Sequence, residues 1–212
     1  MPLPSTIAGL IGAILGIRRK FLIEFVKQKD MHCGAELIGF DGYISEYVRF
    51  FKFPKKRKSE ILKLLEDPKK RKELMPVYKS LSLFQPKYRI AIAVNDEDLR
   101  DELMYRLRNF EFVYDVYGGN DYNFVDRIWA IKKAKILTSD RGRGYCSIDD
   151  FKSVEPDGKA IISSDVVLAN VKKKFVFVCY GEIILKNKLL VVQDDESRVI
   201  VHKASPFLVT NL

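Results

Sequence analysis

The chain has 212 residues and a formal net charge of +9, and 47% of its residues are hydrophobic and 12% aromatic, which is enough for a globular core. The apolar run 7–17 is too short to span a bilayer and lacks the flanks of a signal peptide, so we expect a cytoplasmic protein without membrane contact. Cys33, Cys146 and Cys179 are widely spaced and form no CxxC pair, which indicates reduced thiols and predicts no metal site and no cofactor.

The first residues predict a helix that continues to about Lys29. Pro2 and Pro4 favour an extended approach, and Ser5 or Thr6 is expected to cap the first free amides with its side-chain oxygen. Apolar residues follow at helical spacing and glycines form a ridge beside them: Ile7, Leu10, Ile11, Ile14 and Leu15, with Gly9, Gly12 and Gly16. The ridge is explained either by close packing within the protein or by a phosphate chain approaching the helix N-terminus.

Most of the net charge lies in one stretch. Between Lys52 and Lys72 ten basic residues accompany three acidic ones, and the basic run includes Lys55, Lys56, Arg57 and Lys58. Such a concentration suits a polyanion, nucleic acid before an anionic membrane, although a solvated lysine-rich face has the same composition. Aromatic residues interleave with its beginning, at Tyr43, Tyr47, Phe50, Phe51 and Phe53, and Ser59–Met75 is expected to be helical with breaks at Pro68 and Pro76.

Alternating strands and helices surround this basic stretch. Strands are predicted at 33–40, 88–94 and 112–116, and Asn95 or Asp96 is expected to cap a helix that ends near Asn109. With the opening helix, the order is αββαβ, one strand short of a ferredoxin-like βαββαβ unit.

A glycine-containing loop follows the last of these strands. Gly118, Gly119 and Asn120 leave backbone amides free to meet a phosphate or a base, although a plain turn would have the same residues. Tyr122 and the nearby cations Arg127, Lys132 and Lys133 add a stacking ring and positive charge.

The rest of the chain is predicted to be an antiparallel β region. Asp140–Gly144, which contains Arg141, is interpreted as a basic loop at the domain boundary, either a phosphate contact or a linker. Short strands are expected at 160–163, 166–171, 175–180, 182–185, 189–193 and 199–202, with turns at 186–188 and 194–197.

Three stretches resemble one protein family. Pro2-Leu-Pro-Ser-Thr-Ile-Ala-Gly-Leu-Ile-Gly-Ala-Ile-Leu-Gly16 is similar to the first-helix signature of the Cas-five family, the CRISPR-associated RAMP-superfamily subunits of type I (Cascade) surveillance complexes. Gln85–Val94 resembles the family's "P-x-Y-R" strand and Tyr114–Tyr122 its "Y-x-h-Y-x-G" loop. The resemblance covers roughly the first 130 residues, and the strand that precedes the signature in the family has no counterpart among them.

The resemblance implies an α+β fold: a ferredoxin-like (RRM-like) domain over 1–140, with a basic thumb inserted at about 41–86, and a C-terminal antiparallel β region over 141–212. It implies a non-catalytic subunit that binds the 5′ handle of crRNA in antiviral defence and caps the backbone filament. Its partners would be the Cascade backbone and large subunits, with target DNA met indirectly through the complex. Ser5, Thr6, Gly118, Gly119 and Asn120 would contact the RNA chain with Tyr122 stacking, and Arg18, Arg19, Arg127 and Arg141 would neutralise it.

Two other functions remain open from the sequence. One branch of the family cleaves precursor guide RNA without metal, and such chemistry commonly uses histidine, for which His32 and His202 are the candidates. Neither histidine aligns with a catalytic motif, so we predict no catalytic residue. The third reading is an RRM-like RNA-binding protein outside CRISPR systems.

Overall fold

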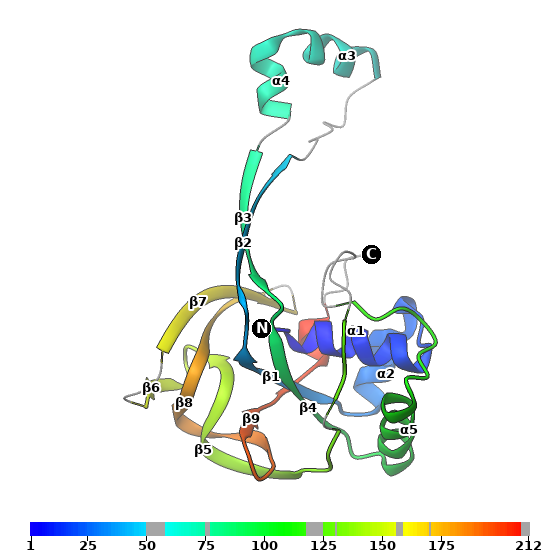
Figure 1. The fold of residues 1–212 in the computed structure, drawn as a ribbon, viewed down its shortest axis with the longest axis vertical. Helices are drawn as coiled ribbons and strands as arrows, with labels where there is room; N and C mark the ends of the chain where they lie inside the picture. Colours follow the sequence, from blue (N-terminus) through cyan, green and yellow to red (C-terminus); the bar gives the residue numbers. More distant parts are fainter. Residues whose placement is uncertain are drawn as a thin grey trace. The chain divides into compact units, whose positions relative to one another are not determined.

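The computed structural model describes residues 1–49, 58–74, 77–117, 125–129, 131–155, 159–169 and 171–208. The chain is a mixed α+β protein that divides into two compact units. We call residues 1–38 with 88–212 the main unit and residues 39–87 the ribbon unit (Figure 1). The ribbon unit spans the range expected for the insert, whereas the expected boundary at 140/141 falls inside a strand of the main unit.

Two helices open the main unit where one was predicted. Helix α1 (Pro4–Leu15) begins directly at Pro4, because proline has no N–H to satisfy and its φ is already helical. Leu3 is the N-cap and makes no side-chain capping bond, so the prediction that Ser5 or Thr6 caps the helix is wrong. Gly16 adopts a left-handed φ of 77° and ends α1, and α2 (Arg19–Gln28) follows as a separate helix.

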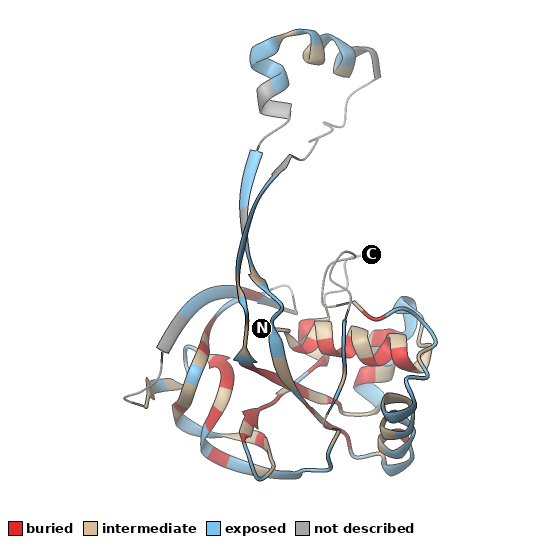
Figure 2. Ribbon diagram, viewed as in Figure 1, coloured by how far each residue is buried: buried red, intermediate tan, exposed pale blue. Residues whose placement is uncertain are grey.

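A three-stranded sheet lies against these helices. Its order is β10 (His202–Lys203), β1 (His32–Gly39), β4 (Lys87–Ala93), which confirms the strands predicted at 33–40 and 88–94. Helix α5 (Glu97–Asn109) is also confirmed, with the Asp96 carboxylate accepting the Leu99 N–H at 2.9 Å. Apolar residues of the helices, of β1 and of the position just before it form the largest core cluster, including Ile7, Ile11, Val26, Met31, Cys33, Ala35, Leu99 and Leu103 (Figure 2).

The strand predicted at 112–116 is absent. This segment is irregular, and it runs across the end of α1, where the N–H groups of Val113 and Tyr114 donate to the carbonyls of Ile14 and Ala13 at 3.4 and 3.0 Å. Its apolar residues therefore pack and cap a helix end, although their alternation imitates a strand. The structure establishes the α+β class. It does not establish a complete ferredoxin-like pattern, because this strand is missing from the described residues.

A larger sheet forms the second layer of the main unit. It contains β5 (Lys135–Ser147), β6 (Phe151–Val154), β7 (Lys159–Leu168), β8 (Val171–Gln193) and β9 (Arg198–Ile200), and a 3-10 helix (Ser205–Phe207) follows β10. All its pairings are antiparallel except β5 with β9.

Several predicted boundaries in this layer are wrong because the strands are longer than expected. Strand β5 runs through Asp140–Gly144, which is therefore not a loop, and β8 continues through the turn predicted at 186–188. Strand β7 joins 160–163 to the first half of 166–171, whereas the strand expected at 199–202 is divided between β9 and β10. The turn at 194–197 is confirmed by the bond from the Asp194 N–H to the Ser197 carbonyl, 3.0 Å.

The two layers touch through their backbones at β1. A Cβ on Gly34 would lie 1.9 Å from the Ile200 carbonyl oxygen, and one on Gly144 would lie 2.3 Å from the Ala35 carbonyl oxygen. Gly144 also has a φ of 106°, which side chains disfavour. The glycine at the end of the Arg-Gly-Arg-Gly stretch is thus required by packing of β5 on β1.

The ribbon unit contains two strands and two helices. Strands β2 (Gly42–Arg49) and β3 (Val77–Phe84) pair antiparallel along their full lengths, from Gly42 with Phe84 to Arg49 with Val77. Helices α3 (Lys58–Glu66) and α4 (Pro68–Leu74) confirm the helical prediction for 59–75 and its break at Pro68. Asp67 caps α4, with its carboxylate accepting the Lys69 N–H at 2.9 Å.

Replacing Gly144 by alanine tests the contact between the layers. We expect Gly144→Ala to lower the free energy of unfolding by about 2 to 4 kcal/mol, because it adds both a clash and a strained φ. Gly9→Ala is the matched control: its Cβ would meet nothing within 4 Å, and we expect it to stabilise helix α1 by about 1 kcal/mol. Urea denaturation of both variants measures the difference, and a neutral Gly144→Ala would contradict the packing.

Candidate nucleic-acid interface

The helices of the ribbon unit carry a basic surface. Lys63, Lys69, Lys70 and Arg71 are exposed, and Lys70 has a nearby carboxylate, Asp67 at 3.8 Å. Ile61, Leu64 and Leu65 are partly buried, so α3 is amphipathic, and its Lys63 faces water. Of the predicted site, Lys55, Lys56 and Arg57 lie outside the described residues, and only the backbone of Lys58 is described, at the start of α3.

The strands of the ribbon unit add exposed aromatic rings. Tyr43 and Tyr47 are both exposed, Tyr47 to 72%, and being four residues apart on one strand they lie on the same face, about 14 Å apart. Lys79 is directly opposite Tyr47 in the register. Rings at this spacing with a cation beside them can stack on the bases of a single-stranded nucleic acid.

Sequence reasoning missed the contribution of the return strand. Val77–Phe84 alternates between valine, lysine and leucine on one side and tyrosine, serine and phenylalanine on the other, which is a strand pattern. That alternation was the available signal for Lys79. The prediction for this region rested on the basic residues that precede the strand and did not include the strand itself.

The structure does not bring together the residues at the two ends of the first helix that were predicted to contact RNA. Ser5 and Thr6 lie in the first turn of α1 and are partly buried, and their amides have no acceptor within the helix. Arg18 and Arg19 are exposed at the start of α2, beyond the opposite end of α1, and a 12-residue helix is about 18 Å long. The two pairs are therefore separated by about the length of the helix and do not form one compact site.

Packing explains two of the three glycines on the ridge of α1. A Cβ on Gly12 would lie 3.0 Å from Leu22 Cδ1, and one on Gly16 would lie 2.9 Å from Val113 Cγ1. Gly9 faces open space. Of the three glycines, only Gly9 therefore remains available for the approach of a phosphate chain from outside the protein.

The other predicted cations differ in their surroundings. Arg127 is exposed, and Arg141 is exposed on β5, where its Nη1 lies 3.2 Å from Glu155 Oε1. Lys133 pairs with Asp101 at 3.2 Å, so its charge is already balanced. Gly118, Gly119, Asn120 and Tyr122 lie outside the described residues.

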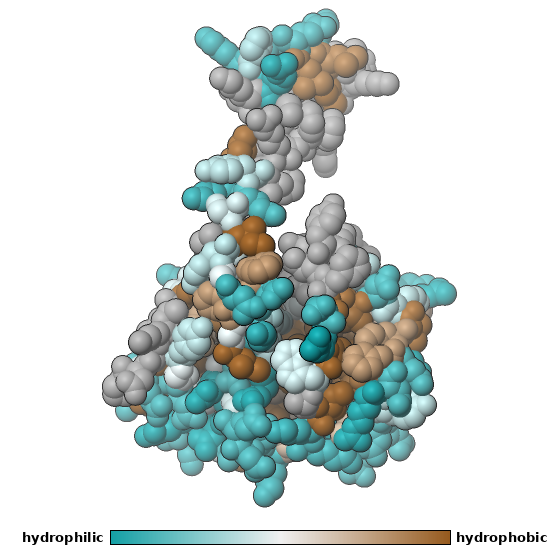
Figure 3. All heavy atoms as spheres, in the orientation of Figure 1, coloured by the Kyte–Doolittle hydropathy of each residue, from teal (hydrophilic) through white to brown (hydrophobic). Residues whose placement is uncertain are grey.

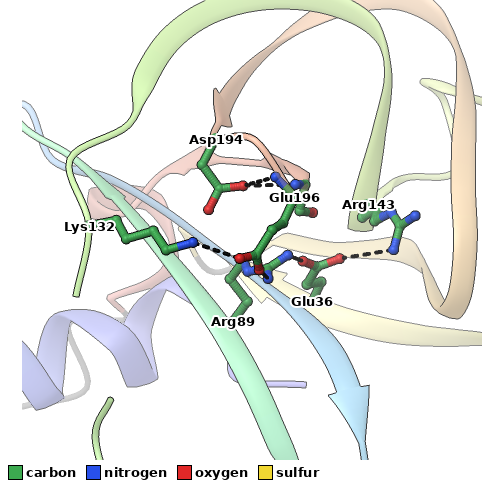
Figure 4. Close-up of polar contacts among 7 residues, drawn as sticks. Glu36, Arg89, Lys132, Arg143, Asp194 and Glu196 are labelled. Atoms are coloured by element: carbon green, nitrogen blue, oxygen red, sulfur yellow. Dashed lines mark hydrogen bonds and ion pairs between the residues drawn. The ribbon is translucent and has the colours of Figure 1, made fainter. Parts of the chain in front are cut away.

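An ion-pair cluster connects the two layers of the main unit (Figure 4). The Glu36 carboxylate is only 5% exposed; it accepts a hydrogen bond from Arg89 Nη1 at 2.7 Å and lies 3.9 Å from Arg143 Nη1. Arg89 also bonds Glu196, which in turn pairs with Lys132 at 2.6 Å. The hydrogen bond from Lys132 lowers the pKa of Glu196, so this carboxylate stays ionised.

Four residues of the cluster line a hollow of about 260 Å³, together with Cys179 and Tyr180: Glu36, Arg89, Arg143 and Glu196. In the cluster, the two carboxylates balance most of the charge of Arg89, Arg143 and Lys132. The cluster therefore holds strands together and leaves little free charge for a phosphate. Lys132, expected near the RNA, belongs to this cluster.

The histidines have structural surroundings. The His202 ring stacks on Tyr145 with centroids 5.3 Å apart, and its Nε2 lies 3.0 Å from the Tyr145 carbonyl oxygen. Burial lowers the pKa of His202, so it is neutral at pH 7. His32 Nδ1 lies 2.9 Å from the Asp30 carbonyl oxygen.

The cysteines are free thiols. Burial raises the pKa of Cys33 and Cys146 to about 12, which makes both thiols unreactive. Among the described residues no group of histidine, cysteine or carboxylate side chains could hold a metal ion.

Removing one cation of the ion-pair cluster at a time tests its role. We expect Arg89→Met to lower the free energy of unfolding by about 3 kcal/mol, because it leaves the buried Glu36 charge without its nearest partner. Lys132→Met removes an exposed partner of the same cluster and should cost less than about 1 kcal/mol. Chemical denaturation of the two variants would show equal losses if burial of Glu36 were unimportant.

The lowered pKa of His202 predicts a loss of stability in mild acid. The unfolded chain takes up the proton near pH 6.5 and the folded protein only at lower pH, so stability is complete above pH 6.5 and falls below it. We expect His202→Gln to flatten the dependence between pH 7 and 5.5 in thermal melts. An unchanged slope in this variant would show that another group causes the acid sensitivity.

Comparisons with known proteins add no family to this picture. A scan against protein-family models and a search of curated proteins found no match to the sequence. None of the helices in the described ranges has both the length and the apolar composition needed to cross a membrane.

Proposed function

We propose that the chain is a non-catalytic RNA-binding subunit of a type I CRISPR surveillance complex, holding the 5′ handle of crRNA. The observation that carries the proposal is the ribbon unit, which combines exposed tyrosines on a two-stranded ribbon with exposed cations on two helices. An isolated two-stranded ribbon is marginally stable in water. A binding partner along the strands would stabilise it.

The two parts of the ribbon unit have different tasks in this proposal. Lys63, Lys69, Lys70 and Arg71 attract the sugar-phosphate chain at long range, independent of base sequence. Tyr43 and Tyr47 stack on unpaired bases and fix the strand in place. The similarity of Pro2–Gly16 to the Cas-five signature supports a guide RNA as the nucleic acid, with the Cascade backbone and large subunits as protein partners.

The first helix has a smaller part than the sequence indicated. Its glycines at 12 and 16 serve packing, and Arg18 and Arg19 lie beyond its far end. The amides of Ser5 and Thr6 at its start remain candidates for a phosphate contact, with Gly9 as the open position on the same helix.

Charge reversal on α4 tests RNA binding by the ribbon unit. We expect Lys69→Glu/Lys70→Glu/Arg71→Glu to weaken binding of a labelled single-stranded RNA carrying the repeat-derived 5′ handle. The slope of log K against log salt should fall by about 2, because each lost phosphate contact removes about 0.7. The matched control reverses Lys172, Lys173 and Lys174, three consecutive exposed lysines on β8, and should change the slope less.

A second variant in the same titrations separates stacking from charge. Tyr47→Ala should weaken binding by about 1 to 3 kcal/mol and leave the salt slope unchanged. Equal losses from the α4 and β8 triple variants would mean that binding follows net charge alone. Retention of full affinity by both α4 and Tyr47 variants would reject the ribbon unit as the RNA site.

A further inference from the structure

Exposed apolar side chains collect at the end of the main unit where α1 and α5 both finish. Tyr105, Phe110, Val113 and Tyr114 are all exposed, and we call these four residues the aromatic patch. The patch is fixed to α1, because the Tyr114 N–H donates to the Ala13 carbonyl at 3.0 Å and the Val113 side chain fills the space over Gly16. Figure 3 shows apolar side chains at the right of the main unit, where Figure 1 draws α1, α2 and α5.

Phe110 has a backbone conformation that is unfavourable for phenylalanine. It is the C-cap of α5 and has a left-handed φ of 57°, a conformation usually occupied by glycine or asparagine. Its side chain is 60% exposed, and its ring contact with Phe112 is tilted at 6.2 Å. Packing within the molecule therefore offsets little of the strain, and strained residues concentrate at binding sites.

Charges of both signs border the aromatic patch. Arg18, Arg19 and Lys20 are exposed at the start of α2, two to four residues beyond Gly16, and the first turn of that helix contains no acidic residue. Cations at a helix N-terminus oppose the helix dipole, so an external carboxylate there would stabilise them.

The carboxylates of the patch argue against a nucleic acid. Glu111 and Asp115 are exposed among its apolar residues, and Glu111 Oε1 accepts the Tyr105 hydroxyl at 3.2 Å. A polyanion laid across the rings would meet both carboxylates. An apolar centre with tyrosine and phenylalanine, bordered by charges of both signs, is typical of protein–protein interfaces.

We propose that the aromatic patch binds another protein. The partner covers Phe110 and Val113 with apolar side chains and places carboxylates opposite Arg18 and Arg19. The inference does not rest on RNA binding by the ribbon unit, which involves other residues and is tested separately.

Site-specific photo-crosslinking identifies what lies on the patch. The photoreactive amino acid p-benzoylphenylalanine replaces Phe110 in the full chain, expressed in cells of the source organism. The matched control carries it at Ile162, an equally exposed apolar residue on β7. We expect irradiation to join one protein to position 110 and not to position 162.

The crosslinked protein is then purified and its affinity is measured directly. Phe110→Asn relieves the left-handed strain, so this variant should melt at the same temperature as the parent or higher, yet bind the partner at least tenfold more weakly. Arg18→Glu/Arg19→Glu should weaken binding as well, with a steeper loss at low salt.

Four results would overturn the proposal: an adduct with RNA only, an adduct with a second copy of the chain, no adduct, or equal crosslinking at 162. Unchanged affinity of Phe110→Asn for the purified partner would overturn it too. Because Phe110→Asn is expected to be well folded, weaker binding cannot be attributed to unfolding.

Discussion

The main unit is organised around the close approach of β1 to the strands of the second layer. Backbone meets backbone at Gly34 and at Gly144, and the buried Glu36 carboxylate lies between Arg89 on β4 and Arg143 on β5. Cys33 and Ala35 on the same strand pack with the helices. Residues 33–37 of β1 are therefore buried on both faces, and Gly34 and the carboxylate of Glu36 follow from that position.

Local signals in the sequence determined most of the helices and the strands of the small sheet. Asp96 capped α5 as expected, Pro68 separated α3 from α4, and the apolar runs at 33–40 and 88–94 became β1 and β4. These features depend on neighbouring residues, which sequence patterns describe well.

The errors arose where distant parts of the chain decide the structure. Residues 112–116 alternate like a strand, but they cap α1, a role that only the folded chain reveals. The glycines of the Arg-Gly-Arg-Gly stretch suggested a flexible loop. They are in fact required by close contacts with Ala35 and Ile200, which lie far away in the sequence. The candidate site was affected in the same way: charge identified the basic helices, whereas Lys79 and the ion pairs of Lys132 depend on pairing across the fold.

In our two proposals, the ribbon unit and the aromatic patch bind different kinds of partner. Excess cations and exposed tyrosines suit RNA, and the strained Phe110 among charges of both signs suits a protein. Both surfaces expose aromatic rings to water, which does not stabilise an isolated protein. Such exposure is expected of a subunit that functions inside an assembly.

The most direct test of the central claim is to isolate the chain from its source cells under native conditions and to sequence the RNA that accompanies it. Our account predicts RNA of uniform length whose molecules share one 5′ segment and differ beyond it. Absence of RNA, or a mixture of unrelated fragments, would contradict the proposal that this chain holds the 5′ handle of a guide RNA.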